Sequence, residues 1–367
     1  MDAQVKTRVI DADAHVIETE RTWDYLAPDE AKYRPVISQP PGDNPAEGGW
    51  MIDGILGPAF LRRFTDDEIK KMSAIAGRDM ATPKAAREMS DVPLRLRHMD
   101  KLGIDVQVLF PTMWLTSLTE NPAAEVALAR SYNSWLIDIC KQAPDRLRWV
   151  CIPPTLVMDE AIAEIRRAKQ NGAVGVFVRA YEGDRLMSDP YFYPMYEEAE
   201  RLDMAMTVHI ANGSQENTVF HMRAPGPVSV KGFTITRLPA VVGCMVLLMS
   251  DIPKTFPKLR WGFIESAAQW VPWVHNEFAR RVHSTGKKMP ADFLGDANIH
   301  LTCQSDDDLA YVLKYAGPKS LLIGTDYGHT DPSAQIDVID LLRARTDIDE
   351  TTKQQILYDN PKRLYGL

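Results

Sequence analysis

Three residues near the start of the chain are of the types that bind metal ions. Asp11, Asp13 and His15 lie in RVIDADAH (8–15), a short apolar run that predicts a buried β-strand. Alternate residues of a strand share one face, so these side chains point the same way. Two carboxylates are costly to bury unless a partner neutralises them. The trio therefore indicates a cation site, with a capping or turn cluster as the alternative.

Three more candidates lie at the ends of later apolar runs. His209 ends AMTVH, Glu265 lies near the end of LRWGFIES, and Asp326 ends SLLIGTD. Singly, they have ordinary explanations: a core histidine, a core salt bridge and a helix cap. If the ends of these runs meet, they supply two imidazoles and two carboxylates from Asp13, His15, His209 and Asp326. That set suits Zn²⁺, and equally Mn²⁺ or Fe²⁺, and leaves a coordination position for water or substrate.

The elements that would position these residues repeat along the chain. Eight short apolar runs predict strands at 8–15, 106–112, 147–154, 174–180, 205–210, 259–266, 298–303 and 320–326. Amphipathic stretches predict helices at 121–143, 158–171, 194–202, 267–283, 306–315 and 332–345. Eight strands that alternate with helices indicate parallel βαβ units and predict an α/β fold, a (β/α)8 TIM barrel. A doubly wound open sheet is the alternative, but no glycine-rich phosphate loop follows any run.

Two segments exceed a minimal barrel. Residues 16–91 follow the first predicted strand, and residues 211–237 follow the fifth. Both leave the carboxyl ends of strands, where barrel enzymes have their active sites. Long loops at such places are commonly functional. We expect one domain over residues 1–367, with 16–91 as a lid or insertion.

Composition and charge exclude several functional classes. The 367 residues are 45% hydrophobic and 25% charged, which is typical of a globular protein. A net charge of −8 disfavours a nucleic-acid partner. The most apolar stretch, 238–249, is too short to span a membrane, and the N-terminus lacks the apolar run of a signal peptide. Four scattered cysteines fit a reducing compartment. We expect a cytoplasmic enzyme for a small-molecule substrate, with no membrane partner.

Several segments resemble the amidohydrolase superfamily and, within it, the aminocarboxymuconate-semialdehyde decarboxylase-like ("amidohydrolase 2") group. They are DADAHVIE (11–18), LRHMDKLGIDVQVLFPT (96–112), GAVGVFVR (172–179), DPYFYPMYEEAERLDMAMTVH (189–209), FPKLRWGFIESAAQWVPW (256–273), GTDYGHTDP (324–332) and ILYDNPKRLYGL (356–367). The resemblance covers almost the whole chain. It implies a (β/α)8 barrel, one divalent metal ion, and either hydrolysis or non-oxidative decarboxylation.

The resemblance also implies roles for single residues. The acidic form of the family's first-strand metal motif matches Asp13-Ala14-His15. Its fifth-strand metal histidine falls on His209, and its eighth-strand aspartate, which binds metal and handles a proton, falls on Asp326. We expect one divalent ion per chain, Zn²⁺ first, with Mn²⁺ or Fe²⁺ as alternatives. Related enzymes are often dimers, so a homodimer is expected by analogy alone.

One position departs from the family pattern. Decarboxylases of this group have an acid/base histidine at the end of the sixth strand, where this chain has Glu265. A carboxylate there could bind the metal, accept a proton from bound water or hold a substrate ammonium. We therefore expect a metal-dependent hydrolase that uses metal-activated water on a small acidic, aromatic or cyclic substrate. Asp326 and Glu265 would handle protons, and His329 is a further candidate proton donor or a backbone-bonded loop histidine.

Two other functions stay open. One is non-oxidative decarboxylation of a hydroxylated aromatic or ring-cleavage acid, and the other is a metal-free binding protein on a barrel scaffold. Arg179, at the end of the fourth strand, favours an acidic substrate because a guanidinium pairs with carboxylates; a structural salt bridge is its alternative. His221 and Arg223 could close over the substrate. Trp114 could flank an aromatic ring, with simple packing as its alternative.

Overall fold

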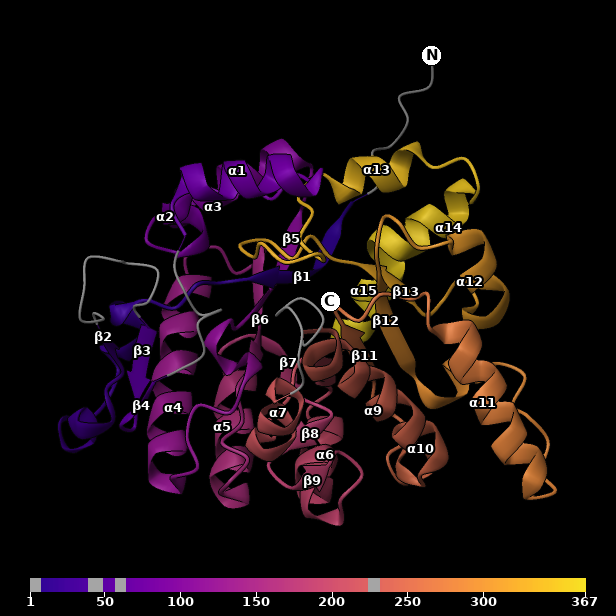
Figure 1. Ribbon diagram of the computed structural model, residues 1–367, viewed down its shortest axis with the longest axis horizontal. Coiled ribbons are helices and arrows are strands. Elements are labelled where there is room, and N and C mark those ends of the chain that lie inside the picture. The colour runs from indigo at the N-terminus through magenta and orange to yellow at the C-terminus, as the bar shows by residue number, and fades with distance from the viewer. Residues whose placement is uncertain (1–7, 39–48, 57–63, 224–231) are drawn as a thin grey trace.

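Eight parallel strands form the centre of the molecule, in the order β1-β5-β6-β7-β10-β11-β12-β13. The computed structural model describes residues 8–38, 49–56, 64–223 and 232–367. The strands are β1 (Ile10–His15), β5 (Val106–Phe110), β6 (Leu147–Cys151), β7 (Ala173–Val178), β10 (Ala205–His209), β11 (Trp261–Ile264), β12 (Ile299–Cys303) and β13 (Leu321–Ile323). Helices surround them (Figure 1). The predicted (β/α)8 barrel is confirmed.

The strands are apolar on both faces because both faces are covered. Every residue of β1, β5, β7 and β10 is buried. One face of each strand fills the barrel interior, and the other packs under the surrounding helices. This explains why the sequence shows continuous apolar runs instead of an alternating pattern.

The helices around the barrel include five of the six predicted ones, close to their predicted ranges, and others that the sequence did not predict. They are α3 (Val92–Leu102), α4 (Pro122–Cys140), α5 (Met158–Gln170), α6 (Tyr193–Arg201), α9 (Leu238–Met249), α10 (Ile252–Thr255), α11 (Val271–Ser284), α12 (Leu309–Ala316), α13 (Val338–Ala344), α14 (Glu350–Gln354) and α15 (Asn360–Tyr365). Asn121 accepts a hydrogen bond from the amide of Ala123, and Pro122 is the first residue of α4, as the sequence predicts. The chain also forms short 3-10 or π-helical turns, which are η5 (Met113–Leu115), η6 (Pro190–Phe192), η8 (Gly295–Ala297) and η9 (Gln355–Asp359).

The last predicted helix, 332–345, forms only over α13. The backbone amides of residues before α13 form hydrogen bonds with other segments instead. The amide of Gln335 donates to the carbonyl of Thr325, and that of Ile336 donates to the carbonyl of Asp79. These long-range hydrogen bonds hold the segment against the end of β13 and prevent a longer helix.

Residues 16–91 contain short elements that follow β1. They are η1 (Glu20–Trp23), η2 (Pro28–Tyr33), β2 (Val36–Ser38), β3 (Gly49–Ile52), β4 (Ile55–Leu56), α1 (Asp66–Ala76) and α2 (Lys84–Arg87). The predicted insertion at 211–237 contains α7 (Gln215–Met222) and η7 (Phe233–Arg237). The hairpin β8 (Tyr181–Glu182) and β9 (Arg185–Leu186) follows β7. Parts of both insertions, 39–48, 57–63 and 224–231, lie outside the described residues.

The barrel closes between β1 and the residues that follow β13. The amide of Asp326 donates to the carbonyl of Asp13 at 2.9 Å, and the amide of His15 donates to the carbonyl of Tyr327 at 2.8 Å. Gly324 is required here because a Cβ at this position would lie 2.3 Å from the Cβ of Asp13. The N-terminal strand and the C-terminal strand are therefore in direct contact.

A buried polar network supports this closure. The Asp11 carboxylate accepts from the amide and hydroxyl of Thr325, at 2.9 and 2.6 Å, and from the Gln107 amide at 2.8 Å. Gln107 in turn accepts a 2.6 Å hydrogen bond from Nε of Arg95, whose guanidinium lies 3.5 Å from the centre of the Tyr327 ring. Burial raises the pKa of Asp11 to about 6.

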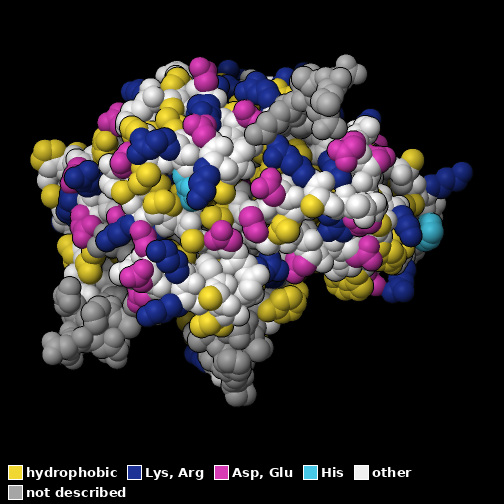
Figure 2. Space-filling view, turned by 90° about the horizontal axis from the view of Figure 1, so that it is seen from above, with side chains coloured by type: hydrophobic (Ala, Val, Ile, Leu, Met, Phe, Trp, Pro, Cys, Tyr) yellow, Lys and Arg dark blue, Asp and Glu magenta, His cyan; other side chains and the backbone are white. Residues whose placement is uncertain are grey.

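The surface carries charges of both signs. Figure 2 shows acidic and basic side chains interspersed over one face, and the described part of that face has no continuous basic patch. This distribution agrees with the net charge of −8. Among the described helices, none is both long and apolar enough to cross a membrane.

We predict that Gln107→Leu destabilises the protein without altering its surface. The change leaves Nε of Arg95 without its buried acceptor and removes one donor from Asp11. Two weakened buried polar groups should lower the free energy of unfolding by roughly 2–4 kcal/mol. Urea denaturation measures this, with Gln142→Leu, an exposed change just after α4, as the control. Equal stability of the two variants would contradict the assigned role of the network.

Candidate metal centre

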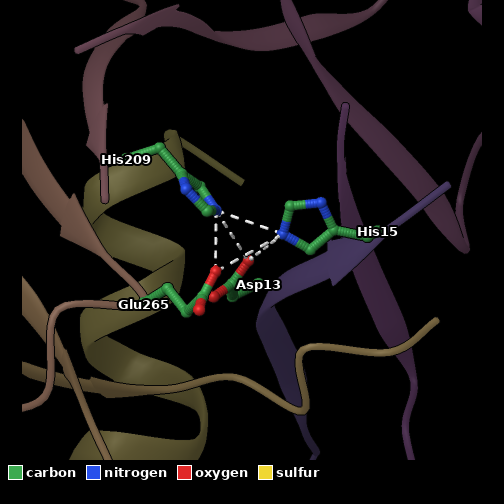
Figure 3. A group of neighbouring side chains, drawn as sticks. All are labelled: Asp13, His15, His209 and Glu265. Atoms are coloured by element: carbon green, nitrogen blue, oxygen red, sulfur yellow. Dashed lines mark hydrogen bonds and ion pairs between the residues drawn. The ribbon is translucent and has the colours of Figure 1, made fainter. Parts of the chain in front are cut away.

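Six polar side chains from four strand ends meet at the carboxyl end of the barrel. They are Asp13, His15, His209, Glu265, Asp326 and His329. Figure 3 shows the first four with their nitrogen and oxygen atoms directed toward one another. All six residues are buried. The parallel barrel produces this convergence because it places the ends of β1, β10, β11 and β13 on one face.

The backbone at two of these positions is strained. Glu265 follows β11 directly and Asp326 lies three residues after the end of β13, with φ angles of 59° and 50°. Residues other than glycine rarely adopt this left-handed conformation, and it costs of order 1–3 kcal/mol. Both side chains are buried among the other members of the cluster. Strain at two converging strand ends indicates that the positions of these carboxylates serve a function.

The facing atoms are separated as neighbouring ligands of one ion would be. Nε2 of His15 lies 3.1 Å from Nε2 of His209 and 3.4 Å from Oδ1 of Asp13. Oε2 of Glu265 lies 3.6 Å from Nε2 of His209, and Oδ1 of Asp326 lies 3.5 Å from Nε2 of His15. Metal–ligand bonds of about 2.0–2.2 Å place adjacent ligand atoms roughly 3.0–3.6 Å apart.

The two central histidines are oriented for metal binding. Nδ1 of His15 lies 2.8 Å from the carbonyl of Pro111, and Nδ1 of His209 lies 2.9 Å from the carbonyl of Ile210. A carbonyl can only accept, so each Nδ1 carries the hydrogen and each neutral ring has its lone pair on Nε2. These two lone pairs face each other at 3.1 Å. Two facing acceptors require a proton or a cation between them.

The carboxylates also require a cation. Within the described part of the chain, neither oxygen of Glu265 has a hydrogen-bond partner, and neither does Oδ1 of Asp13. Burial, followed by the charges of Asp326, Asp331 and Asp13, raises the pKa of Glu265 well above its ordinary value. Burial and the charges of Asp331 and Asp13 do the same to Asp326. A divalent ion would remove this mutual repulsion, so the donor set fits such an ion.

His329 extends the cluster toward the loop after β5. Its ring stacks on that of His15 with centroids 3.7 Å apart. The Thr112 hydroxyl donates to the carbonyl of Val16 at 2.8 Å, so it can accept a hydrogen bond from Nε2 of His329 at 2.9 Å. Nδ1 then faces Oδ1 of Asp326 at 2.7 Å. A proton or a metal ion between these two atoms would satisfy both acceptors.

Glu18 holds the loop that supports His329, and the sequence analysis did not single it out. Its carboxylate accepts from the amides of Thr112 and Met113 at 3.0 and 3.1 Å. Burial raises its pKa to about 7. Glu18 lies within DADAHVIE, but no pattern in that segment marks a backbone-binding carboxylate.

None of the four predicted substrate residues forms a hydrogen bond, ion pair or ring contact with a cluster residue within the described part of the chain. Arg179 forms a buried salt bridge with Glu182, the alternative that the sequence left open, and donates to the carbonyl of Trp114 at 3.0 Å. Trp114 is buried in η5. His221 and Arg223 lie at the end of α7, where Arg223 is exposed. Within the described ranges, neither contacts the cluster.

The chain matches the model of a known family over residues 10–367, and that family is described as amidohydrolase. The chain belongs to the amidohydrolase family. This confirms the resemblance inferred from the segments listed above and agrees with the barrel and its cluster of metal-binding side chains. The amidohydrolase barrel found here is therefore that of an enzyme.

Three individual proteins illustrate the likeness. A curated relative, 2-amino-3-carboxymuconate-6-semialdehyde decarboxylase of Dictyostelium discoideum, is 21% identical over 290 residues, covering 76% of this chain and 77% of the relative. An amidohydrolase of Mycobacterium avium subsp. paratuberculosis matches with a TM-score of 0.80, 16% identity and 99% of both chains. A dihydroxybenzoic acid decarboxylase of Polaromonas sp. JS666, with bound manganese and 2-nitroresorcinol, matches with a TM-score of 0.63, 18% identity and coverage of 98% and 97%.

We predict that this amidohydrolase binds one divalent metal ion per chain and that His209→Ala loses it. Removal of an imidazole whose Nε2 faces the cluster should weaken metal binding by about 100-fold or more. Elemental analysis after dialysis against metal-free buffer measures the occupancy. His283→Ala, a change at the last turn of α11, is the control. Full occupancy in the His209 variant would show that His209 is not a ligand.

Proposed function

We propose that this protein is a metal-dependent, non-oxidative decarboxylase of a hydroxylated aromatic or ring-cleavage acid. The observation that carries this choice is the curated decarboxylase that matches 76% of this chain. The structural likeness to a dihydroxybenzoic acid decarboxylase supports it. The sequence favoured a hydrolase because of Glu265, and the comparisons favour the decarboxylase alternative over that first expectation.

We assign Asp13, His15, His209 and Asp326 as metal ligands, with Glu265 beside them. Zn²⁺ is our first expectation, with Mn²⁺ or Fe²⁺ as alternatives, because imidazole and carboxylate donors suit each of these ions. When bound, the ion would polarise the substrate carboxylate and a neighbouring hydroxyl. The remaining steps belong to the protein side chains.

The essential protein step is delivery of a proton to carbon. Ligand atoms of His329, Glu265 and Asp326 lie within 4.8 Å of one another, and His329 and Glu265 can each hold a proton near the cluster. One of them would protonate the ring carbon that bears the carboxylate. The bond from this carbon to the carboxyl group then breaks, its electron pair returns to the ring, and CO2 leaves. Asp326 would relay the proton through its 2.7 Å contact with Nδ1 of His329.

Hydrolysis is the second candidate, and Glu265 is the observation that favours it. A carboxylate at this position could accept a proton from a bound water during attack on a carbonyl. The same six side chains would serve both reactions. The released product separates them, because hydrolysis of a small substrate yields no CO2.

Other expectations stay proposals. We propose that residues 1–367 act as one domain with 16–91 as its lid. A homodimer is supported by α9, which carries no charged residue and exposes Leu238, Val242 and Met249 to solvent. The cytoplasmic location is supported by four cysteines that are all buried and form no disulfide.

The reaction is tested first with the wild-type protein. We predict that the metal-loaded enzyme releases CO2 from at least one acid in a panel of dihydroxybenzoates and carboxymuconate-type ring-cleavage acids. Trapped CO2 is measured against protein treated with a chelator. If no acid yields CO2 while esters or amides of the same acids are cleaved, the hydrolase alternative holds instead.

We predict that Glu265→Gln lowers turnover by about 100-fold or more with little change in melting temperature. The amide keeps the shape of the side chain but cannot carry the proton or hold the metal as a carboxylate does. Turnover and melting temperature are measured on the same preparation, with the exposed Glu160→Gln as the control. A lowered melting temperature with near-normal turnover would make Glu265 a structural residue.

A further inference from the structure

Two arginines near the mouth of the barrel have different partners. The guanidinium of Arg179 is neutralised by Glu182, with Nε and Nη2 at 3.0 and 2.5 Å from the two carboxylate oxygens. Its Nη1 donates to the carbonyl of Trp114. Three of its five donors are therefore used, and its charge is paired. Arg179 is poorly placed to bind a substrate carboxylate.

Within the described residues, the hydrogen-bond partners of the Arg237 guanidinium are neutral groups. Its Nη1 donates to the backbone carbonyl of Glu265 at 3.0 Å, and its Nη2 donates to the hydroxyl of Ser333. Across the described ranges, no carboxylate lies within 4.0 Å of this guanidinium. Two of its five N–H groups are used by these partners, so three are left for a ligand.

The backbone holds Arg237 beside the cluster. It is the last residue of η7, a single π-helical turn, and such turns are frequent at functional sites. The amide of Ala211, two residues after His209, donates to the carbonyl of Thr236 at 3.2 Å. Arg237 is therefore tied to the loops after β10, β11 and β13, which together carry three of the cluster residues.

The charge of Arg237 acts on the cluster. Arg237 lowers the pKa of Glu265 and Asp326, against the larger effects of burial and of neighbouring charges, and it contributes to the lowered pKa of Asp331. The charge of Arg179 acts instead on Glu125, outside the cluster. Of these two arginines, Arg237 is the one that has no carboxylate partner among the described residues, and it is hydrogen-bonded to the backbone of Glu265.

We propose that Arg237 binds a carboxylate of the substrate at the metal centre and so selects anionic over neutral ring compounds. This rests on the proposed function, in which the substrate is an aromatic or ring-cleavage acid. A partly buried guanidinium with free donors forms short, strong hydrogen bonds with a carboxylate. The competing role is that of a counter-ion that only offsets the acidic cluster.

Binding of matched ligands separates these two roles. The acids are 2,3-, 2,4- and 2,6-dihydroxybenzoate, and their decarboxylated counterparts are catechol and resorcinol. Calorimetry on metal-loaded protein gives each Kd, and elemental analysis checks that the metal content is unchanged. The variants are Arg237→Gln and Arg237→Lys. The control is Arg280→Gln, which removes the same charge from an exposed residue on α11.

We expect Arg237→Gln to weaken binding of the acids by about tenfold or more and to leave binding of the phenols unchanged. Arg237→Lys keeps the charge but loses the planar fork, so it should give a smaller loss that is again confined to the acids. It also serves as the test if the Gln variant does not fold. Equal losses for acids and phenols, no loss at all, or a wild-type protein that binds none of the acids would each overturn the proposal.

The outcome for Arg237 is distinguishable from that for the reaction. If the acids bind in an Arg237-dependent way but release no CO2, the proposed decarboxylation fails and the carboxylate site stands. If the wild-type enzyme releases CO2 and Arg237→Gln binds the acids normally, the reaction stands and Arg237 has no role in substrate binding.

Discussion

The closure of the barrel between β1 and the residues after β13 is the constraint on which the site depends. It brings Asp13 and His15, near the N-terminus, against Asp326, more than 300 residues later in the chain. Asp11 makes this contact specific because its carboxylate accepts from both the amide and the hydroxyl of Thr325. A buried carboxylate thus fixes the register of the two strands that supply most of the proposed ligands.

The same closure creates an electrostatic problem. Asp13, Glu265 and Asp326 are buried within one cluster, and two facing imidazole lone pairs add no positive charge. Repulsion in a low-dielectric interior would favour protonation of the carboxylates or separation of the strand ends. A single divalent ion would offset the repulsion between the carboxylates and would also accept the two imidazole lone pairs. The fold and the metal are coupled in this sense: the strands hold the ligands together, and the ion makes their proximity favourable.

The sequence alone was sufficient to predict the strands and the polar side chains at their ends. A strand buried on both faces leaves a continuous apolar run, so a polar residue at its end, such as His209, is conspicuous. The salt bridge of Arg179 is local, since Glu182 lies three residues later in the chain, and the sequence left it open as an alternative. The short length of α13 depends instead on contacts between distant segments. Local pattern contains no information on such contacts. Arg237 was missed because it is the last residue of a π-helical turn and does not lie at the end of a predicted strand.

The functional residues lie beyond the strands, and this explains why the fold can be kept at low sequence identity. The Mycobacterium structure superimposes with a TM-score of 0.80 at 16% identity, so the barrel tolerates change at most positions. Glu265 and Asp326 lie just beyond their strands, in strained backbone that packing of the strands does not need. A change from histidine to glutamate at the end of β11 can therefore alter proton transfer while the barrel stays the same. For this reason the sequence of the whole chain identifies the family, whereas the reaction depends on a few residues that follow the strands.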